Sequence, residues 1–190
     1  MDLHRSFTFT QGSFMIPLGT AAKVLEIAIG EIGTIEGPKD NETKYGKFTH
    51  FDQLPWCGSF CNWVFAQAKV SIPSMVATAM GAQKLKNIGS WMINPLPGDL
   101  VFFDFPHDGV DKISHIGIVM QVNKTDIWTI EGNTGGVGQS QRNGGMVLAK
   151  VRPLGKGSPI VGYGRPKFLP YSGELPKVTP TDTPTPKVVK

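Results

Sequence analysis

The chain has 190 residues, of which 40% are hydrophobic, as is typical of one globular domain with short extensions. The formal net charge of +4 and the charged fraction of 18% exclude the dense lysine and arginine clusters of nucleic-acid-binding proteins. Two cysteines are too few for a disulfide scaffold, and no run of about 20 apolar residues predicts a membrane-spanning helix. We therefore expect neither a nucleic-acid partner nor stable membrane association.

The N-terminal region begins with polar and aromatic residues, MDLHRSFTFTQGSF, which lack the apolar core of a secretion signal. This predicts synthesis in a cytoplasm, and residues 1–13 form an arm without an assigned role. From Thr20 to Ile32 the apolar residues follow helical spacing, with Thr20 as the N-cap. The following stretch, 33–48, is rich in Gly, Pro, Asn and Asp and indicates a loop.

The rest of the domain changes from helical to β-rich patterns. Helices are expected at Trp56–Ala68 and at Ser74–Leu85. Short β-rich runs separated by turn signals follow, namely LPGDLVFFDF, SHIGIVMQV, IWTIEGN, MVLAKV and IVGYGR. Helices followed by strands predict an α+β fold, with N-terminal helices packed on a central antiparallel β-sheet of about five to six strands.

The C-terminal stretch, residues 172–190, has no aromatic residue and has prolines at 176, 180, 184 and 186. Such a composition predicts an extended, disordered segment. We interpret it as a tail, or as a linker to a C-terminal binding module that is missing from this chain. The folded domain is then residues 14–171.

The stretch WCGSFCNWVF carries both cysteines, Cys57 and Cys61, one helical turn apart. Both lie on the apolar face of the expected helix, so both fit a buried core. Cys57 also opens the helix, where unpaired N–H groups and the helix dipole favour a reactive thiolate. Helical geometry disfavours a disulfide between them, and no second ligand pair has the spacing of a zinc site.

A nucleophilic cysteine needs a histidine base and a group that orients it. His115 opens a strongly apolar strand, whereas His4, His50 and His107 lie in the arm, a loop and a turn. The next strand ends in Glu131-Gly132-Asn133. Because positions 131 and 133 share one face of a strand, a carboxylate and an amide are both candidates to hold His115. The alternative is that they form only a strand end and a turn.

Together these pieces resemble the CHAP domain (cysteine, histidine-dependent amidohydrolase/peptidase), whose architecture is papain-like and related to that of NlpC/P60 peptidases. The matching segments extend from about Thr20 to Pro166: NETKYG, PWCGSFCNWVF, LPGDLVFFDF, SHIGIVM, TIEGNT and GYGRP. The resemblance implies catalytic roles for Cys57, His115, Glu131 and Asn133. The chain has WCGS where NlpC/P60 enzymes have a DCSG-like sequence, and it has no second histidine as third residue, so CHAP fits better.

The resemblance also implies the reaction and its setting. CHAP enzymes usually cleave amide bonds of bacterial peptidoglycan, either between muramic acid and L-Ala or within the stem or cross-bridge peptide. Gln53 and the Cys57 backbone N–H are candidates for the oxyanion hole. Some members bind calcium through an Asp-rich loop that this chain lacks, so we expect no metal and no cofactor.

We expect a monomeric phage endolysin that reaches the wall through a holin. The alternatives are a non-catalytic wall-binding module, a virion-associated protein on the same fold and an interbacterial amidase toxin.

Overall fold

The computed structural model describes residues 15–105 and 112–181, which include four helices and one six-stranded sheet. The elements are α1 (Ala21–Glu31), α2 (Lys44–Thr49), α3 (Cys57–Gln67), α4 (Thr78–Asn87), β1 (Trp91–Met92), β2 (Leu100–Phe103), β3 (His115–Val122), β4 (Asp126–Thr134), β5 (Met146–Pro153) and β6 (Ile160–Gly164). The strands pair antiparallel in the order β1-β6-β2-β3-β4-β5. The α+β fold with an antiparallel sheet is therefore confirmed.

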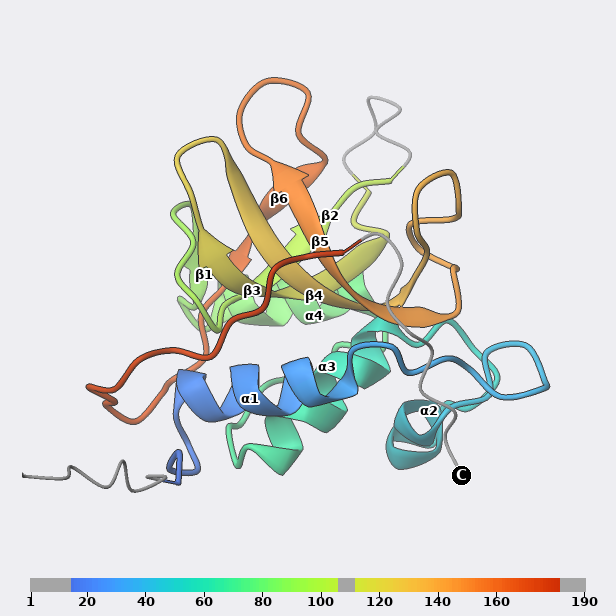
Figure 1. The fold of residues 1–190 in the computed structure, drawn as a ribbon, viewed down its shortest axis with the longest axis horizontal. Coiled ribbons are helices and arrows are strands. Elements are labelled where there is room, and N and C mark those ends of the chain that lie inside the picture. The colour runs from blue at the N-terminus through green and yellow to red at the C-terminus, as the bar shows by residue number, and fades with distance from the viewer. Residues whose placement is uncertain (1–14, 106–111, 182–190) are drawn as a thin grey trace, which may run out of the picture.

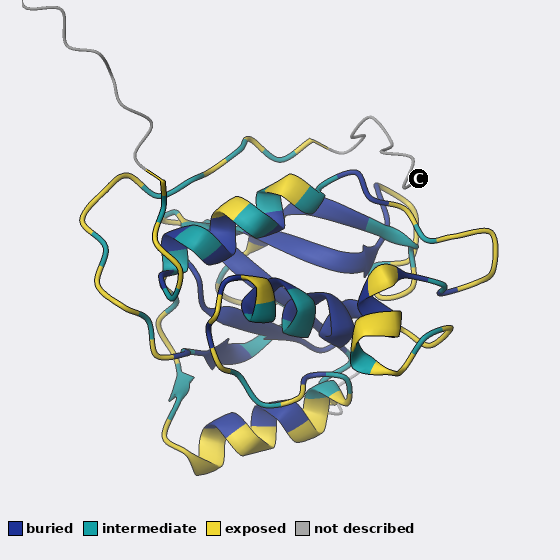
Figure 2. Cartoon of the chain, turned by 90° about the horizontal axis from the view of Figure 1, so that it is seen from below, coloured by how far each residue is buried: buried dark blue, intermediate teal, exposed yellow. Residues whose placement is uncertain are grey.

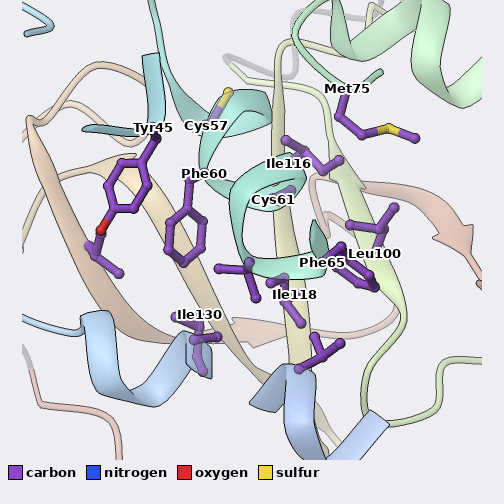
Figure 3. Close-up of a cluster of buried hydrophobic side chains, with 14 of the residues drawn as sticks. Tyr45, Cys57, Phe60, Cys61, Phe65, Met75, Leu100, Ile116, Ile118 and Ile130 are labelled. Carbon is purple, nitrogen blue, oxygen red and sulfur yellow. The ribbon is translucent and has the colours of Figure 1, made fainter. Parts of the chain in front are cut away.

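The helices α1 and α3 lie together against one side of the sheet, and α2 lies beside the start of α3 (Figure 1). The main core fills the space between them and the strands, and α3 supplies its centre with Phe60, Cys61, Val64 and Phe65. Figure 3 shows three of them, Phe60, Cys61 and Phe65, gathered with apolar side chains of the strands in one cluster. Figure 2 shows how buried residues concentrate on the strands and on the helix sides that face them.

The expected helix starts and strands follow local sequence signals. The Thr20 side chain accepts a hydrogen bond from the Lys23 N–H at 3.1 Å and so caps α1, as predicted. Strand β3 alternates, because Ile116, Ile118 and Met120 join the main core while Val119 joins a smaller cluster on the opposite face. This alternation places His115 and Gly117 with Val119, away from the main core.

Two predictions of secondary structure were wrong. The stretch 33–48 is not all loop, because α2 begins at Lys44 with Thr43 as its N-cap, whose side chain accepts the Gly46 N–H at 2.9 Å. The fourth helix is α4, which begins at Thr78 rather than at Ser74. Asn62 of α3 holds the preceding segment extended: its side chain donates to the Pro73 carbonyl at 3.1 Å and accepts the Met75 N–H at 2.7 Å.

The segment after β6 runs back along the molecule between α1 and the sheet (Figure 1). Phe168 stacks on Phe65 of α3, and the Leu169 N–H donates to the Gly19 carbonyl at 2.8 Å. Further along, Leu175 and Val178 pack against the main core. Residues 172–181 form no helix or strand and lie against the domain through these contacts, whereas residues 182–190 of the predicted tail lie outside the described residues.

Candidate active site

The start of α3 presents Cys57 at the end of the sheet. Cys57 is only 5% exposed, so a small part of its surface is open to a reactant. Position 58 requires glycine, because a Cβ there would lie 1.9 Å from the Met75 carbonyl oxygen. Only glycine therefore allows the backbone of Met75 to pack against α3 next to Cys57. The N-cap Trp56 makes no side-chain capping bond, so no cap side chain occupies the first N–H groups of α3.

The second cysteine has a different environment. Cys61 lies one turn further along α3 with no exposed surface, inside the main core. Burial raises the pKa of its thiol well above the ordinary value, and the nearby Cys57 and Glu131 charges add to that rise. Both thiols are free. Cys61 is therefore a protonated core residue, which leaves Cys57 as the reactive one of the pair.

The imidazole of His115 lies between Cys57 and Glu131. Its Nε2 is 3.0 Å from Glu131 Oε2, and both side chains are fully buried. Burial alone would lower the pKa of His115, but the Cys57 thiolate and the Glu131 carboxylate raise it to about 9. The imidazole of His115 therefore carries its positive charge at neutral pH.

The other ring nitrogen, Nδ1, is the one buried side-chain nitrogen or oxygen among the described residues without a hydrogen-bond partner. Cys57 nevertheless acts on the imidazole, because its negative charge contributes to the raised pKa of His115. The sulfur therefore lies near the ring without regular hydrogen-bond alignment. Such contacts tighten when a substrate is bound.

Two neighbours besides His115 hold Glu131 through three hydrogen bonds. Thr129 Oγ1 donates to Oε1 at 2.5 Å, Arg152 Nε donates to Oε1 at 2.8 Å and Arg152 Nη2 donates to Oε2 at 2.5 Å. Burial alone would raise the pKa of this carboxyl, but Arg152 and His115 hold it well below the usual range. Glu131 therefore accepts from His115 as an ionised carboxylate.

Glycine makes room for this carboxylate at position 117, on the neighbouring strand β3. A Cβ there would lie 2.6 Å from Glu131 Cγ and 3.2 Å from the Ile130 carbonyl oxygen. The HIG sequence that opens β3 thus has two linked parts: His115 binds the carboxylate, and Gly117 leaves the space in which it lies.

Asn133 does not bind His115. Its amide nitrogen donates to Asn41 Oδ1 at 3.1 Å and to Asn143 Oδ1 at 3.3 Å, and its Oδ1 accepts the Gly145 N–H at 3.2 Å. The expectation that positions 131 and 133 face His115 together therefore holds for Glu131 alone. The β4–β5 register shifts between Glu131 and Thr134, and Asn133 has a φ of 56°, so the strand alternation ends before it.

The remaining candidates are exposed or lie outside the described residues. Gln53 is exposed in the segment before α3, with a φ of 58°. His50 is the exposed C-cap of α2, and His4 and His107 lie outside the described residues. Residues 15–105 and 112–181 contain no group of three or more His, Cys, Asp or Glu side chains placed to hold a metal ion. None of their helices is long and apolar enough to cross a membrane.

The sequence reasoning missed Arg152. The signal was present as two charged residues at alternate positions, Lys150 and Arg152, within the apolar run of β5. Both are nearly buried, and Lys150 Nζ donates to the Gly135 carbonyl at 2.7 Å. A buried charge at a strand position indicates a partner on the neighbouring strand.

Comparison with protein families agrees with this geometry. The family model of the CHAP domain matches residues 49–133, a range that contains Cys57, His115, Glu131 and Asn133. The predicted resemblance to this family is confirmed. No curated protein matches the chain.

Proposed function

We propose that this chain hydrolyses an amide bond of the bacterial cell wall with Cys57 as nucleophile. Residues 49–133 match the CHAP domain, and such domains are in general cysteine- and histidine-dependent amidohydrolases or peptidases of peptidoglycan. The observation that carries this proposal is the buried series Cys57–His115–Glu131. The Glu131 carboxylate binds Nε2 of His115, whereas Nδ1 has no hydrogen-bond partner and Cys57 acts on the same ring. That series is the arrangement of a nucleophile, a base and an orienting group.

In the proposed reaction, His115 takes the Cys57 proton and Glu131 stabilises the resulting imidazolium. The sulfur attacks the amide carbonyl carbon, and the oxyanion accepts hydrogen bonds from the uncapped first turn of α3, where the helix dipole adds positive charge. As the tetrahedral intermediate collapses, the C–N bond breaks, a thioester forms and His115 gives its proton to the leaving amine. Water then attacks the thioester with His115 as base and restores the free thiol.

Two bonds fit this chemistry: the amide between muramic acid and L-Ala, and an amide within the stem or cross-bridge peptide. Digestion of purified peptidoglycan followed by mass spectrometry separates them. New L-Ala amino ends beside intact glycan identify an amidase, whereas new ends inside the peptides identify an endopeptidase.

The matched control is Cys57→Ala, which removes only the sulfur of a nearly buried side chain. We expect this variant to fold and to release no fragments. Release by Cys57→Ala at the wild-type rate, or no release by the folded wild type from several wall types, would refute the proposal.

We further propose that the biological setting is phage lysis, with release to the wall through a holin. This rests on the sequence resemblance. Expression in a host with and without a holin tests it, and lysis that needs the holin is the expected result.

A further inference from the structure

Arg152 is a buried cation that the reaction described above does not use. It is 7% exposed and donates through two nitrogens to both oxygens of Glu131. Its guanidinium carbon also lies 5.4 Å from the Phe103 ring centre and 5.1 Å from that of Phe105. These two rings stack on each other and lie 5.8 Å and 5.9 Å from the His115 ring.

The reaction itself creates the need for such a cation. A fully buried carboxylate is costly unless an opposite charge compensates it. His115 supplies that charge only while it is protonated, and it gives up its proton when the amine leaves. Arg152 stays protonated throughout, so Glu131 stays ionised in both states of His115.

Arg152 has a third contact, which leads out of the centre. Its Nη1 donates to Gln141 Oε1 at 3.0 Å. Gln141 lies in the loop between β4 and β5, and its own Nε2 donates to the carbonyls of Gly135, Gly136 and Gln139 at 3.3, 3.2 and 2.9 Å. A single side chain thus joins the fold of this loop to the guanidinium that holds Glu131.

We propose that Arg152 is a positioning residue of the active site, which keeps Glu131 ionised and aligned on His115 through the whole cycle, and that Gln141 links this alignment to the loop of residues 135–145. The proposal rests on the proposed function for its reaction. The titratable and charged groups facing the Glu131–His115 pair in the described residues are Cys57 and Cys61 from α3 and Arg152 from β5.

The first test is the rate at which iodoacetamide alkylates Cys57 between pH 5 and pH 9, a readout that needs no wall substrate. Each variant is paired with its Cys57→Ala form, which measures background labelling. For Arg152→Met we expect the acid limb of the alkylation profile to move by about one pH unit, so that the rate at a given pH on that limb falls about tenfold. The limb moves to higher pH because a protonated Glu131 no longer stabilises the imidazolium.

The matched control is Arg165→Met. Arg165 also binds a buried carboxylate through two nitrogens, at 2.9 and 2.7 Å from Asp99, but away from the site. Its loss should lower the melting temperature and leave the alkylation profile unchanged. Arg152→Lys keeps the charge and loses the two-nitrogen contact, so its profile should lie between those of the wild type and Arg152→Met. Gln141→Ala should move the limb in the same direction by a smaller amount.

The proposal is overturned if folded Arg152→Met has the wild-type alkylation profile, or if Arg152→Met and Arg165→Met shift it equally. If Arg152→Met does not fold, Arg152→Lys decides, and a profile and turnover equal to those of the wild type overturn the proposal. Peptidoglycan hydrolysis is measured separately. A shifted alkylation profile in a chain that digests no wall would leave the role of Arg152 standing and refute only the proposed substrate.

Discussion

Gly117→Ala displaces the carboxylate that orients His115 without changing its charge. The new Cβ would lie 2.6 Å from Glu131 Cγ, whereas carbon atoms pack at about 3.5–4.0 Å, so the carboxylate must move by roughly 1 Å. The backbone oxygen of Ile130, at 3.2 Å, limits movement of the strand itself. Because a displacement of about 1 Å at a reacting group costs on the order of 10²-fold in rate, we expect a loss of that size.

Hydrolysis of peptidoglycan suspensions and thermal unfolding of the same samples measure the two consequences. Overpacking at this site should lower the free energy of unfolding by about 1–3 kcal/mol and leave a folded protein. The matched control is Gly30→Ala at the end of α1, where no atom lies within 4 Å of a new Cβ and the change should add up to about 1 kcal/mol of stability. Wild-type turnover in folded Gly117→Ala would refute the role given to the position of Glu131.

Three further outcomes follow from the same structure. Cys61→Ala should keep most of the activity and cost about 1 kcal/mol of stability, because Cys61 is a fully buried core thiol; equal loss in Cys57→Ala and Cys61→Ala would contradict the assignment within α3. Hydrolysis rates should fall as pH rises through about 9, because the raised pKa of His115 keeps the imidazolium through neutral pH and releases its proton there; a limb near pH 6.5 would show that Glu131 and Cys57 do not stabilise the charge. Deletion of residues 172–190 should lower the free energy of unfolding by about 1–3 kcal/mol while activity persists, because Leu175 and Val178 pack against the core; an unchanged melting temperature would show that these contacts contribute nothing.

The parts of the fold that sequence predicted are those with strong local signals. The Thr20 cap, the apolar spacing of α1 and the alternation of β3 each identify an element without knowledge of its neighbours. The helix α2 was missed because six residues are too few to show helical periodicity. Its cap at Thr43 was the available signal.

The site residues that could be predicted are likewise those with a local sequence signal. Cys57 and His115 stand out because a helix start and a strand start are visible in the sequence. Arg152 does not, because its contact with Glu131 depends on the register of β4 and β5, and sequence patterns determine register only when strand pairing is already known. A shift in that same register removed Asn133 from the face of Glu131, which strict alternation could not foresee.

Asn133 can therefore be separated from Glu131 by experiment. Asn133→Gly keeps the left-handed backbone at no steric cost and removes the hydrogen bonds to Asn41, Asn143 and the Gly145 N–H. We expect it to lower the free energy of unfolding by about 1–3 kcal/mol, with the pH profile of hydrolysis unchanged, because none of these bonds reaches His115.

Glu131→Gln, in contrast, should change the pH profile of hydrolysis. It removes the charge that raises the pKa of His115, so the alkaline limb should move to lower pH, and turnover should fall by up to about 10⁴-fold, the cost of replacing the orienting carboxylate in a catalytic triad. Both variants are assayed at a temperature at which thermal unfolding shows that each is folded. If Asn133→Gly moved the alkaline limb as far as Glu131→Gln does, the amide would act on His115 during the reaction, and its bonds to Asn41 and Asn143 would belong only to the resting enzyme.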